Sequence, residues 1–473
     1  MKKLINFGCI LILSLSVIIL GTGKASAEMT ELKVALYPYV PNIQQFRDAI
    51  REEWNNAKQS DPSLENTQLN FICEHVDPGN CPWDGGYDDR DSPPDADVYV
   101  FDAMFFEEYR SKNWLEPIQA SEIEDKEDFV QYAIDGVQES GEYYAIPQLG
   151  CANVLFYKAD DPLANATNLT DINNELGECT YTSEIPPDPR GFMLDMSGST
   201  TNASLYLDIA HSLTGDDSFP LPQKESQLNS DAIDNMQELL AMASYENATD
   251  STEPYIKSYQ RAEWFSKGWG RAFMGYTEAM SNMNKETRND IGFKVMPLSN
   301  QDESYPGVFY ADVIAINPIT EQRGTRDQAV KLANVMASKE TMLKSIGVNG
   351  GTYPEPQYLM ANRISVFNTL KTSFPLYGDM LSLITDNNPI MFKLDQDAHS
   401  KLEEIKYTIR SKARENYSCG CDYPATEPIT NNSVAPAICN TTCASNGGWN
   451  RQWTNEYPAA QSGSVCGCNT CNF

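Results

Sequence analysis

Basic residues are scarce in this 473-residue chain, in which 35 lysines and arginines stand against 66 aspartates and glutamates, for a formal net charge of −31 at pH 7. A nucleic-acid-binding protein needs a surplus of Lys and Arg on at least one face to neutralise phosphates. The composition therefore argues against binding to nucleic acid. Acidity alone identifies no substrate.

Histidine is scarcer still, because the chain contains only His75, His211 and His399. So few histidines give poor support for a Ser-His-Asp triad or a His-ligated metal site. The two common glycine-rich phosphate loops are also missing, and the residues around Cys151 lack the papain-type signature. We expect an enzyme or binding protein without a metal or cofactor.

Long apolar runs are missing beyond the N-terminus. The run Ile10–Leu20 is shorter than the ~20 residues that a membrane span needs, and it lies between Lys2-Lys3 and the small residues Ala25-Ser26-Ala27. This order predicts a removable secretion signal over residues 1–27 rather than a membrane anchor. We expect an extracellular monomer with no membrane attachment after the signal is removed.

The chain contains 12 cysteines. Because exported thiols usually form disulfides, the predicted secretion signal implies that most of them are paired. Eleven remain once Cys9 is removed with the signal. Seven of them crowd the last 55 residues and predict a disulfide-stapled tail over 416–473, with a zinc site as the less favoured alternative. The tail cysteines are Cys419, Cys421, Cys439, Cys443, Cys466, Cys468 and Cys471.

The body of the chain supplies the other four cysteines. Cys73 and Cys81 flank a turn-rich segment and could pair with each other, whereas Cys179 could reach the tail. Cys151 is then left over, although parity alone does not identify it. It lies between two apolar segments, where a single thiol at the mouth between strands is a candidate nucleophile. The alternative is a buried structural cysteine.

Seven Asn-x-Ser/Thr sequons are compatible with a glycoprotein, although chance would produce several in a chain of this composition. They begin at Asn165, Asn168, Asn202, Asn247, Asn416, Asn431 and Asn440.

Alternating strand and helix patterns predict an α/β fold. We expect strands over 32–37, 69–72, 97–101, 154–157 and 308–316, and helices over 43–57, 202–213, 231–243 and 326–338. The segment 264–276 is expected to form a helix, a turn and a short strand. Thr277 is then expected to cap a helix over Glu278–Lys285. Ligands bind at the carboxyl ends of strands in such sheets, which is where Tyr37 and Asp102 lie.

Six stretches of the sequence form a recognisable set. They are LKVALYPYVP (32–41), DVYVFDAMF (97–105), YAIPQLGCANVLFY (144–157), SYQRAEWFSKGWGRAFMGYTEAM (258–280), FYADVIAIN (309–317) and KLANVMAS (331–338). Together they resemble the bacterial thiaminase I family, whose members are secreted enzymes with the two-lobed periplasmic-binding-protein fold of type II. A cysteine after a Pro-Gln pair, combined with Gly-Tyr-x-Glu, is the most specific part of the resemblance. The insertion at 73–95 and the tail depart from the bacterial pattern.

The resemblance implies a division of the chain into lobes with a cleft between them. Lobe 1 is expected to begin with residues 28–150 and lobe 2 to comprise 151–307. Residues 308–415 are expected to return to lobe 1 with closing helices, before the cysteine-rich tail.

The resemblance also implies site residues. Cys151 would be the nucleophile and Glu278 the general base, with Asp102 and Asp312 against the aminopyrimidine of thiamine. The cleft would be lined by Tyr37, Tyr259, Tyr276 and Tyr310. Tyr87 belongs to the insertion, which the resemblance does not cover.

Thiamine chemistry suits these residue types. A thiolate that adds to the pyrimidine ring allows neutral thiazole to leave, and an organic nucleophile then adds at the methylene. Carboxylates can accept hydrogen bonds from the ring amine, and tyrosines offer flat faces to a cation. The resemblance thus implies that the pyrimidinylmethyl group of thiamine is transferred from thiazole to an amine, pyridine or thiol. The alternative is a solute-binding protein for thiamine or a related cation, which would not need Cys151 beside Glu278.

Overall fold

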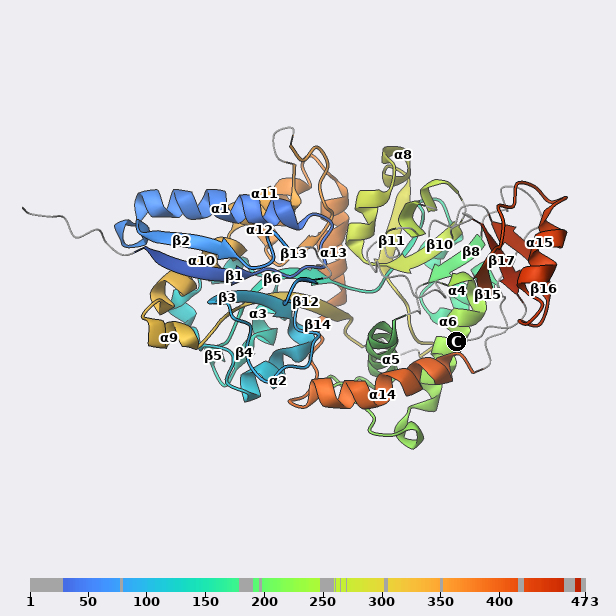
Figure 1. The fold of residues 1–473 in the computed structure, drawn as a ribbon, viewed down its shortest axis with the longest axis horizontal. Coiled ribbons are helices and arrows are strands. Elements are labelled where there is room, and N and C mark those ends of the chain that lie inside the picture. Colours follow the sequence, from blue (N-terminus) through green and yellow to red (C-terminus); the bar gives the residue numbers. More distant parts are fainter. Residues whose placement is uncertain are drawn as a thin grey trace, which may run out of the picture.

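Two β-sheets lie side by side along the long axis of the molecule, and a small C-terminal unit lies beyond the second sheet (Figure 1). The structure is a computed structural model. It describes residues 29–76, 80–177, 190–194, 198–246, 259, 261–263, 265–268, 270–301, 305–348, 352–415, 421–454 and 464–468. The predicted signal over 1–27 lies outside these residues. None of the described helices is both long and apolar enough to cross a membrane.

The larger sheet has seven strands within the described residues, in the order β13-β6-β12-β3-β1-β2, with β14 paired to β12. β12 is antiparallel to both β3 and β6, and β1 is parallel to β3. The carboxyl ends of β1, β3 and β6 therefore meet at one edge of the sheet. The strands are β1 (Thr30–Ala35), β2 (Thr67–Phe71), β3 (Val98–Asp102), β6 (Ile146–Cys151), β12 (Val308–Ile316), β13 (Met360–Ala361) and β14 (Ile390–Met391).

Helices pack on this sheet through buried apolar faces. In α1, Phe46, Ile50 and Trp54 recur every four residues and are all buried, as expected for one face of an amphipathic helix. α1 packs against α10 and α11, and α10 packs against β6 and β12. The helices of this half are α1 (Ile43–Ser60), α2 (Phe106–Ser111), α3 (Gln131–Gly136), α9 (Ile319–Arg323), α10 (Arg326–Ala337), α11 (Lys339–Ile346), α12 (Ile364–Leu370) and α13 (Leu376–Asn387). A short hairpin, β4 (Gln138–Glu139) and β5 (Glu142–Tyr143), precedes β6.

The smaller sheet has five strands within the described residues, in the order β11-β7-β10-β8-β9. Its helix α14 packs against α5 and α6 and also touches the short 3-10 helix Ala103–Phe105 that follows β3. α14 therefore connects the two halves of the molecule. The elements are β7 (Val154–Lys158), β8 (Arg190–Leu194), β9 (Ala243–Glu246), β10 (Gly270–Gly275), β11 (Ile291–Val295), α4 (Leu169–Leu176), α5 (Ser199–Thr214), α6 (Ser230–Met242), α8 (Lys285–Arg288) and α14 (Ala398–Ala413).

The C-terminal tail is a disulfide-stapled unit, as predicted. It contains β15 (Cys421–Pro424), α15 (Ala435–Thr442), β16 (Trp449–Thr454) and β17 (Val465–Cys468), with the three strands in one sheet. Two disulfides join α15 and the residue after it to β17, Cys439–Cys466 and Cys443–Cys468. These cysteines and Trp453 form a small core of their own.

The predicted disulfide Cys73–Cys81 is also present, and Cys151 is a free thiol. The expectations for Cys179, Cys419 and Cys471 lie outside the described residues, as does the side chain of Cys421.

The helix predicted over Glu278–Lys285 is wrong. The chain instead forms a 3-10 helix, η8 (Thr277–Asn282), and α8 begins only after Asn284. Two side chains bond to backbone groups that a continuous α-helix would need: Ser281 donates to the carbonyl of Glu278, and Asn284 accepts from the N–H of Thr287. Such local bonds compete with helix formation. Thr277 does not act as the N-cap, because the residue before η8 is Tyr276 and it makes no side-chain cap.

Candidate active site

A cavity of about 340 Å³ lies at the carboxyl-end edge of the larger sheet. All eight residues that the sequence analysis selected line this cavity, which we call the catalytic cavity. They are Tyr37, Asp102, Cys151, Tyr259, Tyr276, Glu278, Tyr310 and Asp312. Residues separated by more than 270 positions in the sequence therefore meet in one place.

Strand register fixes four of these side chains. Cys151 is the last residue of β6 and lies opposite Tyr310 of β12, whereas Asp312 of β12 lies opposite Asp102, the last residue of β3. Residues two apart on a strand face the same side, so Tyr310 and Asp312 both reach the cavity. The thiol and the two carboxyl groups are thus held on neighbouring strands.

Cys151 is half-buried and lines the cavity, where acidic groups surround its thiol. Burial raises its pKa well above the usual value, and the carboxyl groups of Glu278 and Asp312 raise the pKa further. A thiol in such surroundings is protonated at neutral pH. It needs a base to become a nucleophile.

Glu278 is the acid best placed to act as that base. Its side chain is only 8% exposed, and within the described residues its Oε2 has no hydrogen-bond partner. Burial raises its pKa to about 7. The cost of desolvation thus favours the protonated form of this carboxyl group. A carboxyl group with a pKa near 7 can both accept and return a proton at neutral pH.

Asp102 and Asp312 form an acidic pair across β3 and β12. Burial raises the pKa of Asp102 above its usual value, although Tyr87 and the N–H of Met104 donate hydrogen bonds to it. The pKa of Asp312 is raised well above its usual value by burial and then by the neighbouring Asp102 and Glu278. Two buried like charges destabilise each other, so the site favours a cation between them.

Tyr87 is a site residue that the sequence analysis left aside. Its hydroxyl donates to Oδ2 of Asp102 at 2.5 Å and lies 3.4 Å from the hydroxyl of Tyr37. The sequence hint at a turn before it is the pair Gly85-Gly86, and both glycines adopt positive φ values, 83° and 103°. Such a turn brings the insertion back over the sheet, where the N–H of Asp102 donates to the carbonyl of Gly85.

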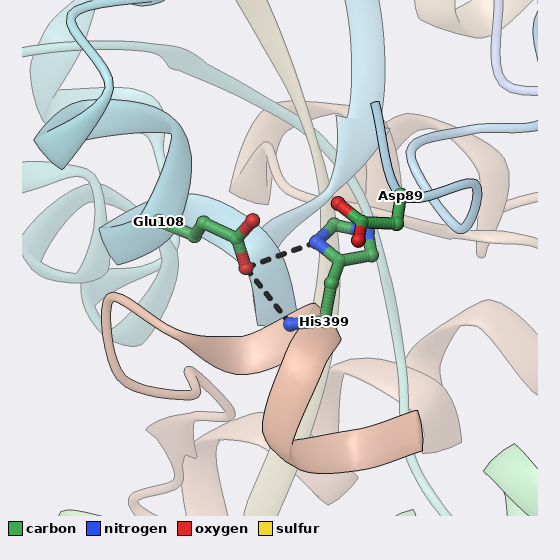
Figure 2. A group of neighbouring side chains, drawn as sticks. All are labelled: Asp89, Glu108 and His399. Atoms are coloured by element: carbon green, nitrogen blue, oxygen red, sulfur yellow. Dashed lines mark hydrogen bonds and ion pairs between the residues drawn. The ribbon is translucent and has the colours of Figure 1, made fainter. Parts of the chain in front are cut away.

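Figure 2 shows the buried pair His399 and Glu108, which supports this turn. Nδ1 of His399 lies 2.9 Å from Oε2 of Glu108, and its Nε2 lies 2.7 Å from the carbonyl oxygen of Gly86. Because a carbonyl only accepts, Nε2 carries the proton of that bond. His399 also stacks on Phe105 at 3.9 Å. His399 of α14 thus fixes the position of Gly86, the residue before Tyr87.

Asp89 completes a cluster with Glu108 and His399 in which a metal ion could be considered (Figure 2). Lys112 already supplies positive charge there, since its Nζ lies 2.6 Å from Oε1 of Glu108 and 4.0 Å from Asp89. Although burial raises the pKa of Glu108, the hydrogen bonds from His399 and Lys112 outweigh it and lower the pKa to about 2. Lys112 and Glu108 thus form an ion pair at this cluster, with Asp89 at its edge.

A second buried network holds the other side of the cavity. The side-chain amide of Asn153 donates to Asp208 at 2.8 Å and to the hydroxyl of Tyr310 at 3.3 Å. Burial raises the pKa of Asp208 to about 7. Asn153 lies between β6 and β7, where the chain passes from the larger sheet to the smaller one.

Several known proteins are similar to this chain over most of its length. A family model described as the Thiaminase-1 domain matches residues 152–299. Thiaminase-1 of Paenibacillus thiaminolyticus is 31% identical over 390 residues, which are 82% of this chain and 89% of that protein. The structure of Clostridium botulinum thiaminase I in complex with thiamin is 34% identical, with a TM-score of 0.70 over 81% of this chain and 100% of that one.

The fold is also that of periplasmic binding proteins. The maltose-bound MalE3 of T. maritima has a TM-score of 0.54 over 82% of this chain and 95% of that one, at 14% identity. The two-lobed type II binding-protein fold is therefore present, with the disulfide-rich tail added to it.

Proposed function

Because the chain belongs to the thiaminase I family of thiamine-degrading enzymes, we propose that it cleaves thiamine by base exchange, with Cys151 as the nucleophile and Glu278 as the base. The observation that carries the proposal is the free thiol of Cys151 in one cavity with a buried carboxyl group of Glu278 that has no described partner. A protein that only captures a solute has no need of this pair.

The first half-reaction begins with proton transfer from the Cys151 thiol to Glu278. The sulfur then forms a bond to a carbon of the pyrimidine ring, and the electron pair moves into the ring. The bond between the methylene and the thiazolium nitrogen breaks, and that nitrogen takes the bonding pair, so thiazole leaves as a neutral molecule. The pyrimidine remains attached to Cys151.

The second half-reaction transfers the pyrimidinylmethyl group. The lone pair of an amine, pyridine or thiol forms a bond to the methylene carbon, and the electrons return through the ring to expel the Cys151 sulfur. The thiolate recovers its proton from Glu278. Each group thus ends in its starting state, and no oxidant or metal is consumed.

Asp102 and Asp312 orient the pyrimidine in this proposal. Thiamine carries a positive charge, and a cation between two raised-pKa carboxyl groups favours their ionised forms. The carboxylates can then accept hydrogen bonds from the exocyclic amine and from a protonated ring nitrogen. Tyr37, Tyr259, Tyr276 and Tyr310 supply aromatic walls.

The test is mass spectrometry of the purified protein incubated with thiamine and pyridine, beside the variant Cys151→Ser. We expect free thiazole and a pyridine-substituted pyrimidine from the wild type and neither from the variant. Tight binding of thiamine without turnover in both proteins would instead identify a thiamine-binding protein, with Cys151 as a structural thiol.

We also propose that the protein is exported, with residues 1–27 removed. The disulfides Cys73–Cys81, Cys439–Cys466 and Cys443–Cys468 support this proposal, because such bonds persist in oxidising compartments. The mass of the protein recovered from the culture medium tests it. An N-terminus that retains residues 1–27 would contradict signal removal.

A further inference from the structure

A second and larger cavity adjoins the catalytic cavity. It has a volume of about 920 Å³, and Tyr39 and Tyr259 line both cavities. The loop after β1 runs along both, with Tyr37 in the catalytic cavity and Val40 in the larger one. We call the larger one the outer cavity.

The walls of the outer cavity are largely apolar. The disulfide Cys73–Cys81 forms one side together with Ile72 and Val76. Val76 is 42% exposed although it is a large apolar side chain, and it faces this cavity. An open concave surface with apolar walls is typical of a small-molecule site. The wall belongs to the 73–95 insertion, which departs from the bacterial pattern.

The charges of the outer cavity disfavour an anion. Three acidic residues line it, Glu74, Asp84 and Glu263. The cation that lines it, Arg47, donates from Nη2 to the carbonyl of Cys73 at 3.3 Å and is outnumbered by these acidic residues. A neutral molecule therefore suits these walls better than a negatively charged one.

Base exchange brings a second molecule, the acceptor, to the catalytic cavity after thiazole has left. Since the pyrimidine stays attached to Cys151, the acceptor must approach the methylene from the place that thiazole leaves. A smaller cavity lined by Asn153 and Met274 also adjoins the site, but its volume is about 80 Å³. Cavities known to hold a benzene-sized ring are roughly 150 Å³. Of these two neighbours, the outer cavity alone has room for a ring.

We propose that the outer cavity binds the acceptor, and that it selects neutral aromatic nitrogen bases that carry an apolar substituent. This inference rests on the proposed base-exchange function. The ring nitrogen reaches the methylene past Tyr39 and Tyr259, and the substituent lies against Val40 and Val76. The nitrogen lone pair forms the new bond, and the Cys151 sulfur leaves with the electron pair of the bond to the ring.

Internal competition between two acceptors tests the proposal. The full-length protein is incubated with thiamine and equal concentrations of pyridine and 4-phenylpyridine, and the two products are quantified by mass spectrometry. Both acceptors compete for the same intermediate. Their product ratio is therefore independent of the amount of folded enzyme and of the rate of thiazole release.

Two variants narrow the outer cavity, Val76→Trp and Val40→Phe. The matched control is Val434→Trp, which makes the same change as the first at a valine of the tail that is 37% exposed. We expect the ratio of 4-phenylpyridine product to pyridine product to fall about tenfold or more in both cavity variants, because added bulk in a filled site is strongly unfavourable. The control should keep the wild-type ratio.

The outcomes separate the two proposals. Normal transfer with an unchanged ratio in both cavity variants would overturn the acceptor site and leave base exchange intact. A wild-type protein that releases no thiazole would overturn the base-exchange function itself.

Discussion

The pH dependence of thiazole release is the sharpest consequence of the site. Glu278 must be ionised to accept the proton of Cys151, and burial raises the pKa of Glu278 to about 7. The single-turnover rate should therefore rise with pH through about 7. It should be roughly tenfold lower at pH 6 than on the plateau, since each pH unit below the pKa reduces the ionised fraction about tenfold.

Quenched-flow measurement of thiazole with enzyme in excess isolates this step from acceptor binding. Glu278→Gln should reduce the rate by about 10² to 10⁴ and remove the acidic limb, because the amide cannot accept the proton. Asp208→Asn is the matched control, since the pKa of Asp208 is also raised to about 7 but this residue does not line the catalytic cavity. The reasoning is refuted if the rate of Glu278→Gln still falls below pH 7 as in the wild type. It is also refuted if the rate of Asp208→Asn no longer falls there.

The same pKa makes a prediction for stability. When folding raises the pKa of a carboxyl group, the native state favours the protonated form of that group. The contribution of the group to the free energy of unfolding is therefore highest below the unfolded pKa, and it falls as pH rises through the folded pKa. The shift of Glu278 from 4.5 to about 7 corresponds to at most about 3 kcal/mol. Glu278→Gln should therefore be more stable relative to wild type at pH 8 than at pH 5. Urea unfolding at both values checks this, and an equal difference at both would contradict it.

Three further predictions concern the surroundings of the site. Tyr87→Phe removes the hydroxyl that donates to Asp102, so steady-state assays should show a KM for thiamine raised about tenfold; an unchanged KM would place Tyr87 outside substrate binding. His399→Ala should raise the same KM, and His399→Gln less so, because the amide can still donate to the carbonyl of Gly86; equal effects would argue against this bond. Removal of the C-terminal tail should leave kcat/KM within about twofold, since most of its buried residues form a core of their own and Val465, which packs on the main core, does not line the catalytic cavity. A larger loss would show that the tail supports the site.

Most of the fold could be predicted from apolar periodicity. The strand over Val308–Ile316 is confirmed at both ends, and the helix predicted from Ile43 begins there and runs on to Ser60. These elements have long, regular apolar patterns that local sequence reports well. The segment after Tyr276 was predicted incorrectly, because side-chain hydrogen bonds of single residues decide between a 3-10 helix and an α-helix there.

The residues of the candidate site could be predicted from sequence for a different reason, which is their resemblance to a known family. Cys151, Glu278, Asp102 and Asp312 stand within segments that resemble a known family, and they line one cavity. Tyr87 could not be selected in this way, since its position depends on a turn of the insertion that is fixed by distant contacts. The protonation of Glu278 was likewise beyond sequence, because burial is a property of the assembled cavity.

The acidic surroundings of Cys151 have a consequence for the lifetime of the protein. Thiol–disulfide exchange proceeds through the thiolate, and its rate follows the ionised fraction. Burial, and after it the carboxyl groups of Glu278 and Asp312, keep that fraction very small by raising the pKa of the Cys151 thiol. We therefore expect the reduced Cys151 to exchange only slowly with the three described disulfides of the chain. The same charges that favour a cationic substrate act as chemical protection for the empty enzyme.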